Sequence, residues 1–433
     1  MPMIGSQTTA ACNFTGHKTA IKDGVLLDVW KLSYQSWESI GGQLQPIEIR
    51  GFAARPVGSE VMPGVVYAHG LGGFAKEANA TGTAALLGMF TIAYTGPGGV
   101  DPSDPDNLDT QSEGLPAGHD NGYRLFDTVP DPRGSWFWGH YVAAMRAVTC
   151  LESRGDVDPQ RLGITGHSGG GAASLVAAAV DERIKVSVPL SGTGAWDVAT
   201  ESPAAWQHTL LLEAGLDIQS TQWASLIKNL DARVLLPNTK ARIMMVNGSS
   251  DEFFPLTAHL ATYDAINGTD KRTSIAGNFD HGCYPFMLIE DEKVIAERAA
   301  LRASGGQRLW FRHWFGTDAK YQYLPAMPEV TAESVGLATM VQATVDTGGT
   351  GYDVEKVRFW ASNDNAHLFF STEMDELGGG VYTRLVPAPL QGNTVYYVDV
   401  QYKTKGLLFP ERFSLSSRPY VPDGLIPDIW TCF

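Results

Sequence analysis

The chain has 433 residues and an ordinary apolar content, so we expect one large domain with a sizeable core and a smaller second domain. Its formal net charge of −15 argues against a nucleic-acid-binding protein, which needs clustered lysine and arginine to hold phosphates. No apolar run reaches the roughly 20 residues that span a bilayer. The first 16 residues also lack the basic and apolar segments of a signal peptide.

The composition says little about the compartment. Charged residues are few, while glycine, threonine, asparagine, tryptophan and tyrosine are plentiful, which favours an extracellular protein. The four cysteines are Cys12, Cys150, Cys283 and Cys432, and no CxxC pair suggests zinc or thioredoxin-type chemistry. A Cys12–Cys432 bridge would join the two ends of the chain. Three pairings are possible, and four unpaired thiols fit the sequence equally well.

The first half of the chain begins with short strands. Residues 26–30 and 47–52 nearly alternate in polarity, as half-buried strands do. Residues 65–68 and 91–94 read as buried strands, and the first of them ends at His69-Gly70. The segment 100–133 is rich in Asp, Pro, Gly and Asn, and loops of this length are usually functional or mobile.

Strands and helices then alternate along the chain. A helix is expected at 136–150 and another at 172–180, with a strand at 161–165 between them. Further strands are expected at 186–190 and 241–246. This alternation predicts an α/β fold with a mostly parallel sheet covered by helices on both faces.

Two segments fall outside this α/β pattern. Residues 196–240 are mainly helical in pattern and are expected to form a small cap over the catalytic edge. After about Pro325 the composition changes, and residues 336–418 show repeated short strands with turns between them, which predicts a β-sandwich of roughly 100 residues. We therefore expect a catalytic domain at 1–325, whose first strands fill 12–62, and an all-β accessory domain at 326–433.

The most informative motif is Gly166-His167-Ser168-Gly169-Gly170, which lies between an expected strand and an expected helix. In that context Gly-x-Ser-x-Gly predicts a nucleophile elbow, a sharp strand-to-helix turn that exposes the serine hydroxyl. The small neighbours are needed because the strained turn leaves no room for bulky side chains. An ordinary Gly/Ser turn is the alternative, and the flanking elements argue against it.

A serine nucleophile needs a base, and the base needs an orienting acid. Asp251 is the first acid after Ser168 that follows a strand end, and Glu252 is its alternative. The expected base is His281, which lies in a loop beside a glycine about thirty residues later. His259 follows Asp251 too closely, and His313 lies in a late aromatic helix, where packing is the simpler interpretation.

Acyl transfer also needs donors for the tetrahedral oxyanion. We expect one to be the backbone N–H of Gly169, and the other to come from the loop after the early strand, where Leu71 is favoured over Gly70 and Gly72. Candidate pocket residues at strand and loop ends are Trp196, Tyr94 and Phe253, although such aromatics more often serve packing.

The sequence predicts neither a cofactor nor a metal. The glycine-rich run at 96–99 lacks the Lys-Ser/Thr of a P-loop and the Gly-x-Gly-x-x-Gly pattern. No His-Glu-x-x-His motif or carboxylate cluster suggests a catalytic metal.

Taken together, segments 65–73, 166–170, 248–251 and 280–282 resemble the α/β-hydrolase superfamily, and most closely its dienelactone hydrolase, acetyl xylan esterase and prolyl oligopeptidase-like branch. Arg55-Pro56 before the Val-Val-x-x-His-Gly strand adds to the likeness, which covers roughly residues 45 to 320. The resemblance implies a serine hydrolase with Ser168, Asp251 and His281 at the triad positions. The later strands look like an immunoglobulin-like addition.

The leading hypothesis is a cofactor-free serine carboxylesterase that acts on a small-molecule or carbohydrate polymer ester through an acyl-enzyme. One alternative is a peptidase or amidase on the same triad, although prolyl oligopeptidase-type chains usually carry a propeller, which this sequence lacks. A second alternative is an inactive binding protein, motivated by the added β domain. The sequence leaves acyl and alcohol specificity and oligomeric state open.

Overall fold

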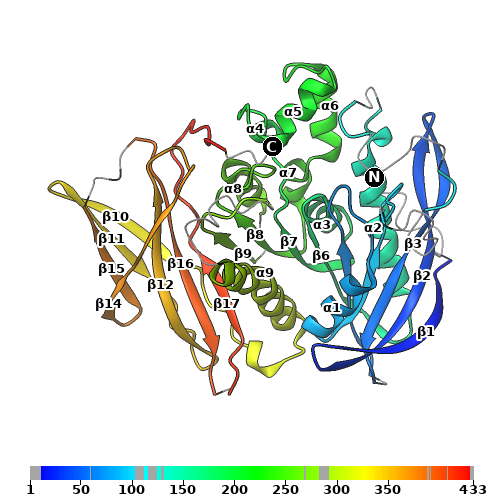
Figure 1. The fold of residues 1–433 in the computed structure, drawn as a ribbon, viewed down its shortest axis with the longest axis horizontal. Coiled ribbons are helices and arrows are strands. Elements are labelled where there is room, and N and C mark those ends of the chain that lie inside the picture. The colour runs from blue at the N-terminus through cyan, green and yellow to red at the C-terminus, as the bar shows by residue number, and fades with distance from the viewer. Residues whose placement is uncertain are drawn as a thin grey trace. The chain divides into compact units, whose positions relative to one another are not determined.

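The computed structural model describes residues 11–58, 60–101, 103, 112–115, 124–127, 131–267, 270–281, 292–387 (292–296 by backbone only), 390, 392–406 and 408–429. The chain divides into two compact units. Figure 1 labels the helices and strands and colours them in chain order. The first comprises Met1–Asp197, Thr209–Ile243 and Asp264–Asp270, and the second comprises Val198–His208, Met244–Tyr263 and Lys271–Phe433.

The first unit is built on a mixed sheet with the strand order β1-β2-β3-β5-β4-β6-β7. The antiparallel strands come first in the chain: β1 (Asn13–Lys22), β2 (Val25–Ile40) and β3 (Gln43–Pro56). The strands of the parallel part are β4 (Met62–Ala68), β5 (Phe90–Tyr94), β6 (Val157–His167) and β7 (Ile184–Leu190). Strand β5 pairs antiparallel with β3, which joins the two parts.

Helices cover both faces of this sheet. The helices of the first unit that pack on it are α1 (Glu77–Leu87), α2 (Trp136–Glu152) and α3 (Gly169–Val180). Ala93 of β5 lies in the apolar cluster that contains Ala80 and Ala84 of α1. The next residue, Tyr94, donates its hydroxyl to the carbonyl of His140 in α2. Because successive strand residues point to opposite faces, α1 and α2 lie on opposite sides of the sheet.

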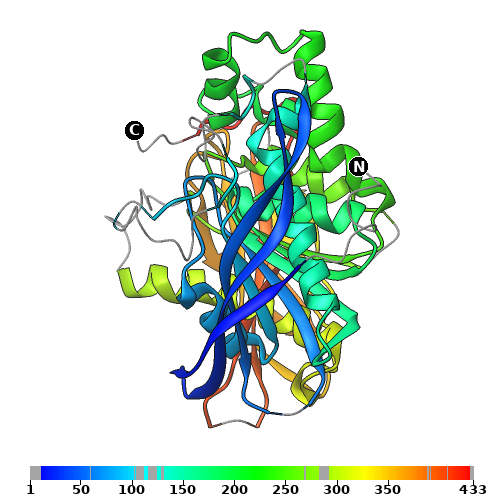
Figure 2. The same cartoon turned by 90° about the vertical axis from the view of Figure 1, so that its right-hand side faces the viewer.

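The early strands are longer than the sequence pattern predicts. Strand β2 pairs with β3 from Leu27–Pro56 to Ile40–Gln43, forming a long twisted hairpin that Figure 2 shows in blue. Side chains near the middle of β2 are buried under α2, where the Tyr34 hydroxyl donates to the Ala143 carbonyl at 2.9 Å. The hairpin is therefore part of the core and not a surface addition.

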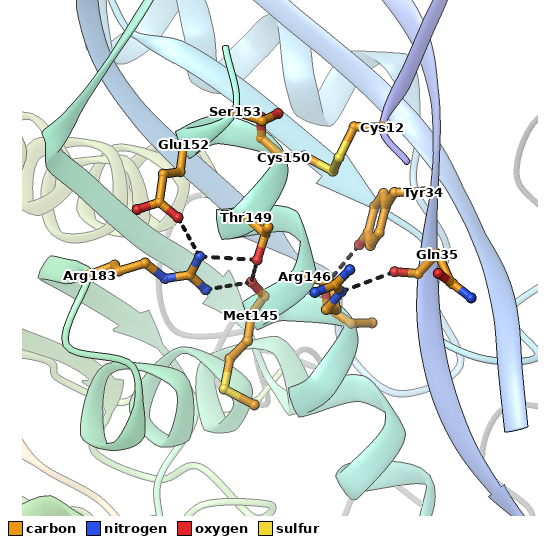
Figure 3. The surroundings of a disulfide bond; sticks show 11 residues. Cys12, Tyr34, Gln35, Met145, Arg146, Thr149, Cys150, Glu152, Ser153 and Arg183 are labelled. Atoms are coloured by element: carbon orange, nitrogen blue, oxygen red, sulfur yellow. Dashed lines mark hydrogen bonds and ion pairs between the residues drawn. A yellow bond between two sulfur atoms is a disulfide. The ribbon is translucent and has the colours of Figure 1, made fainter. Parts of the chain in front are cut away.

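A disulfide joins Cys12, just before β1, to Cys150 in α2 (Figure 3). The Cys12–Cys432 bridge considered from the sequence is therefore wrong, because Cys12 has another partner. Cys283 and Cys432 lie outside the described residues. Beside the bridge, Arg183 connects α2 to the start of β7 through Glu152 (2.7 Å) and Thr149 (3.1 Å).

The second unit begins in the α/β pattern and ends in β structure. Its first elements are β8 (Arg242–Gly248), α8 (Leu256–Ala265), β9 (Lys271–Ala276) and α9 (Glu292–Phe315). The first two residues of β8 and the last two of α8 cluster with the first unit. Two four-stranded antiparallel sheets follow, in the orders β10-β11-β15-β14 and β13-β12-β16-β17. Their strands are β10 (Glu329–Val335), β11 (Ala338–Thr344), β12 (Tyr352–Ser362), β13 (Phe370–Glu373), β14 (Asp375–Gly378), β15 (Val381–Val386), β16 (Val395–Thr404) and β17 (Arg412–Ser416). The immunoglobulin-like arrangement and the 325/326 boundary stay predictions.

A buried ion pair ties α9 to the second of these sheets. Arg302 of α9 donates to Asp399 of β16 at 2.9 Å, with side chains 1% and 0% exposed. Arg302 also donates to the carbonyl of Ile275 in β9 at 2.8 Å, so a single guanidinium connects three elements. Removing one partner would leave an uncompensated buried charge, which typically costs about 3–5 kcal/mol.

The segment 196–240 is helical, as its pattern predicts. It holds α4 (Trp196–Ala199), α5 (Trp206–Glu213), α6 (Thr221–Leu230) and α7 (Ala232–Leu235). Its role as a cap stays a prediction. Most of the acidic loop at 100–133 lies outside the described residues, although its end contains the 3₁₀ turn η1 (Pro132–Gly134); two further turns are η2 (Leu236–Asn238) and η3 (Ala319–Tyr321).

Candidate active site

Ser168 stands at a strained turn between β6 and α3. Its backbone has φ +61° and ψ −124°, a conformation that residues other than glycine rarely adopt. Its N–H donates to the Leu190 carbonyl of β7 at 3.0 Å, and its carbonyl accepts from Ala172 of α3 at 3.0 Å. The side chain of Ser168 does not cap the helix. Strain held by such surroundings is characteristic of functional residues.

The glycines around Ser168 are required by close backbone packing. A Cβ at Gly166 would lie 2.5 Å from the Ala68 carbonyl oxygen of β4, and a Cβ at Gly171 would lie 2.8 Å from the Leu190 carbonyl oxygen. A Cβ at Gly170 would also overlap the Ala68 carbonyl. The triple glycine after Ser168 thus lets α3 start directly against the ends of β4 and β7.

The loop after β4 passes beside this elbow. A Cβ at Gly70 would lie 2.9 Å from the Cβ of Ser168, and a Cβ at Gly169 would lie 3.0 Å from the backbone nitrogen of Leu71. Gly72 has φ +72°, and Gly73 donates to the Gly70 carbonyl at 3.0 Å, which closes a tight turn. The structure therefore brings Leu71 and Gly169, both predicted as oxyanion donors, next to each other and next to Ser168.

His69 holds this loop in place. Its Nε2 accepts the N–H of Gly96 at 2.7 Å, so its proton is on Nδ1, which donates to the Gly70 carbonyl at 2.6 Å. Burial lowers the pKa of His69 to about 4, against a smaller opposing effect of the Gly70 carbonyl. His69 consequently stays neutral in this tautomer at any pH near neutrality, and the strand-end loop keeps one shape.

Asp251 and His281 are in contact in the second unit. Both carboxylate oxygens of Asp251 lie 3.1 Å from Nδ1 of His281. Asp251 Oδ1 also accepts the N–H groups of Phe253 (3.0 Å) and Phe254 (2.8 Å), which fixes the carboxylate after the end of β8. The Asp251 side chain is 0% exposed and that of His281 is 12% exposed. An imidazole whose Nδ1 faces a buried carboxylate presents Nε2 as a base.

Opposing effects act on the charge of His281. Burial alone would lower its pKa, but the carboxylates of Asp251, Glu252 and Asp280 together raise the pKa above its ordinary value. Glu252, the alternative acid, accepts the backbone N–H of His281 at 2.9 Å. It therefore holds the loop of His281, while Asp251 holds the ring.

Two positioning residues were missed by the sequence reasoning. Asn278 has φ +56°, and its side-chain amide exchanges two hydrogen bonds with the backbone of Phe369, at 2.7 and 2.8 Å, which anchors the loop that carries His281. In the first unit the buried Asp231 accepts the N–H groups of Ala195 (2.8 Å) and Trp196 (2.7 Å) after β7. Burial raises the pKa of Asp231 to about 6 although these bonds lower it. A positive φ and a long-range side-chain contact leave no signal in a sequence.

The aromatic residues predicted for the pocket differ in burial. Trp196 is 2% exposed and packs on Phe137, with ring centroids 5.0 Å apart, and Tyr94 is 0% exposed against His140. Phe253 is half-buried, and its ring centroid lies 4.4 Å from that of His281. Contact of these residues with a substrate stays a prediction.

No group of three or more His, Cys, Asp or Glu residues that would suit a metal ion occurs in the described part of the chain. Among the same residues, no helix combines the length and apolarity needed to cross a bilayer.

Comparisons with known proteins assign the chain to a family. The sequence matches the family model of acetyl xylan esterase (AXE1) over residues 28–294. It is 32% identical over 122 residues to a 4-O-methyl-glucuronoyl methylesterase of Podospora anserina, a match that covers 26% of this chain and about a quarter (25%) of that relative.

Two solved structures are similar in fold. An acetyl xylan esterase from Paenibacillus sp. R4 has a TM-score of 0.52 and 19% identity, covering 69% of this chain and 90% of that one. Acetyl xylan esterase 1 from Thermoanaerobacterium sp. JW/SL YS485 has a TM-score of 0.50 and 15% identity, covering 67% and 89%. The match over residues 28–294 takes in more than half of the chain, so this protein belongs to the acetyl xylan esterase family, within the α/β-hydrolases.

Proposed function

We propose that this protein is a serine carboxylesterase that removes acetyl groups from carbohydrate esters, with Ser168 as nucleophile, His281 as general base and Asp251 as orienting acid. The observation that carries the proposal is the buried Asp251–His281 pair at 3.1 Å, which fixes the imidazole proton on Nδ1. The strained backbone of Ser168 is the second support. Family membership supports the ester as substrate.

The reaction would run in two balanced halves. Oγ of Ser168 attacks the ester carbonyl while its proton passes to Nε2 of His281, and the oxyanion is stabilised by the N–H groups of Leu71 and Gly169. Collapse breaks the bond to the alcohol, which takes the proton from His281 and leaves an acetyl-enzyme. Water then attacks that carbonyl, giving its proton to His281, and the release of acetate returns the proton to Ser168.

A second ester is supported by the Podospora relative. The 122-residue match to a 4-O-methyl-glucuronoyl methylesterase favours methyl esters of glucuronate as an alternative substrate. There the leaving group would be methanol and the acyl part a sugar acid. Initial rates on acetylated xylo-oligosaccharides and on a glucuronate methyl ester at matched concentration separate the two. If the methyl ester is turned over faster, the proposed acyl group becomes the sugar acid in place of acetate.

Replacing the nucleophile tests the activity itself. Ser168→Ala should abolish p-nitrophenyl acetate hydrolysis and labelling by a fluorophosphonate probe, with the circular dichroism spectrum unchanged. Ser225→Ala in α6 is a matched control and should retain both. Substantial hydrolysis by Ser168→Ala would refute the role of Ser168, and an unlabelled wild-type protein would favour the binding-protein alternative. Faster cleavage of aminoacyl amides than of esters would favour a peptidase.

We also propose an extracellular site of action. The Cys12–Cys150 bridge requires an oxidising environment, because cytosolic thiols are kept reduced. The proposed polysaccharide substrate is found outside the cell, so the disulfide and the substrate both favour an extracellular location. In this proposal residues 326–433 form an accessory β-sandwich of immunoglobulin-like type. A thiol titration of protein from the native host that finds Cys12 and Cys150 reduced would contradict this location.

A further inference from the structure

A surface cavity of about 630 Å³ lies in the second unit, and no step of the proposed reaction uses it. Its lining residues come from α8, the start of β9, the segment 326–330 that leads into β10, β16, and the segment 417–420 that follows β17. We name it the tyrosine–arginine groove after the side chains that matter for its chemistry: Tyr263, Lys271, Arg272, Tyr396, Arg418 and Tyr420. Its volume falls in the range of about 300–1,000 Å³ that is typical of ligand sites.

The aromatic part of the groove is a stacked pair. The rings of Tyr396 and Tyr420 lie 4.8 Å apart with an interplanar angle of 22°. The two backbones exchange hydrogen bonds at 3.1 and 2.8 Å, so the pair is held rigidly. Tyr420 is nevertheless 51% exposed. A preordered aromatic surface of this kind suits the flat C–H face of a sugar ring, because the face of an aromatic ring carries partial negative charge.

The charged part of the groove is positive. Lys271, Arg272 and Arg418 line it, with Glu329 as an opposing carboxylate. Arg272 donates to two backbone carbonyls, of Pro325 (3.2 Å) and Lys271 (2.9 Å), and no carboxylate of the described residues pairs with it. Those bonds orient the guanidinium and leave its charge uncompensated. A planar guanidinium held in this way is suited to bind a carboxylate.

This local charge is unusual for the protein. The chain carries a net charge of −15, yet the residues that line the groove include three cations and one carboxylate. At physiological ionic strength charges beyond about 8 Å are largely screened, so the local cations decide what binds. An anionic membrane or a nucleic acid would instead meet the acidic remainder of the surface. A compact ligand that has both a sugar face and a carboxylate matches the tyrosine pair and the cations together.

We propose that the tyrosine–arginine groove binds a uronic-acid-bearing oligosaccharide, such as a glucuronate branch on the polysaccharide that carries the ester. The proposal deepens the proposed function and rests on it for the identity of the polymer. A second contact with the polysaccharide would raise the effective concentration of its ester groups near the active site. It would act on polymeric substrate and leave small esters unaffected.

The test is a direct binding measurement on full-length Ser168→Ala protein, which would not consume the ligand. Calorimetry would compare a xylotriose bearing a 4-O-methyl-glucuronate branch with neutral xylotetraose. We expect the acidic sugar to bind about tenfold more tightly or better, with affinity falling as NaCl rises. Equal affinity for the two sugars, or no binding of the acidic sugar, would overturn the proposal. The proposal would also be overturned if polyglutamate, which carries carboxylates without a sugar face, competed for the groove as well as the acidic sugar does.

Matched variants locate the binding. Tyr420→Ala and Arg272→Gln should each weaken binding about tenfold. Phe370→Ala, which removes a ring that is 66% exposed, and Arg384→Gln on β15 should stay within about twofold. If Arg272→Gln loses thermal stability, the exposed Arg418→Gln takes its place. Unchanged affinity in the groove variants would refute the site.

Catalytic assays separate this proposal from the proposed function. In the Ser168-containing protein, the groove variants should hydrolyse p-nitrophenyl acetate normally and show a raised KM only on glucuronate-bearing acetylated xylan. An inactive wild-type protein that still binds the acidic sugar would refute the esterase and keep the groove. A wild-type protein that hydrolyses the ester but does not bind the acidic sugar would refute the groove and leave the esterase proposal standing.

Discussion

Replacing Asp251 by asparagine isolates the charge that the structure places against His281. The change keeps the side-chain shape, and an amide oxygen can still accept the N–H groups of Phe253 and Phe254. The carboxylate oxygens lie 3.1 Å from Nδ1, so the two charge centres are about 4 Å apart when His281 is protonated. At the effective dielectric constant of about 20 found near protein surfaces, that pair is worth about 4 kcal/mol, against about 1 kcal/mol in water.

Burial decides between these two figures. Because the side chains are 0% and 12% exposed, the larger one applies, and it corresponds to a loss of about 10³ in kcat at about 1.4 kcal/mol per tenfold. Asparagine can also donate to Nδ1, which would move the histidine proton to Nε2 and remove the base, so about 10³ is a lower bound. Turnover of p-nitrophenyl acetate at saturating substrate measures the effect.

Glu252→Gln is the matched control, because Glu252 is a second buried carboxylate beside the same histidine. Its oxygen accepts the backbone N–H of His281 rather than a ring proton, and a glutamine oxygen can keep that bond. We expect a fall in kcat of less than about tenfold. The roughly 1 kcal/mol expected for this ion pair in water corresponds to a loss of about fivefold in kcat. If Asp251→Asn loses less than that and Glu252→Gln loses more, the assignment is refuted and Glu252 is the orienting acid.

Three further predictions follow from the geometry. The base must be neutral, and the pKa of His281 is raised, so activity should fall as the pH drops through a value above about 6.5; a kcat profile with its midpoint below that value would contradict this. Replacing Cys12 and Cys150 by serine opens a loop of 138 residues and should lower unfolding stability by about 5 kcal/mol, read as a Tm decrease of about 10–20 °C that reduction of the wild type reproduces. Gly170→Ala should destabilise the protein by about 3 kcal/mol or more, because the new Cβ would overlap a backbone carbonyl. Gly82→Ala in α1, where a Cβ would meet no other atom, should stabilise the protein by up to about 1 kcal/mol. Equal urea midpoints for the two variants would refute the packing argument.

The parts of the site that follow from local chain geometry could be predicted from the sequence. A strand, a serine between glycines and a helix specify one sharp turn, and the structure has that turn at Ser168. The Asp251–His281 contact could be anticipated because few acids after Ser168 follow a strand end and few later histidines lie in a loop beside a glycine. The α/β pattern and the later antiparallel strands were also predicted, and the structure has both. The sheet is mixed rather than mostly parallel, because β1, β2 and β3 add antiparallel strands to it.

The rest depends on contacts between distant segments. Three pairings of the cysteines were open, and only the fold, which brings Cys12 before β1 next to Cys150 of α2, selects this pair. The anchoring of Asn278 to Phe369 spans 91 residues, and an asparagine in a loop gives no indication of its partner. The length of β2 was underestimated because buried positions in its second half are polar: Ser36 and Glu38 are both 0% exposed, so polarity does not follow burial there.

Backbone strain gives a line of evidence for the functional segments that does not use the serine motif. Of the seven described residues other than glycine with positive φ, four lie just after β6, β7 or β9: Ser168, Ser191, Ala195 and Asn278. Each such residue costs about 1–3 kcal/mol and persists only where its surroundings impose it. The observed constraints are the Leu190 carbonyl at Ser168, the carboxylate of Asp231 at Ala195 and the Phe369 backbone at Asn278. In α/β sheets the ligand-binding loops follow the carboxyl ends of strands, so the strain lies where that rule expects chemistry.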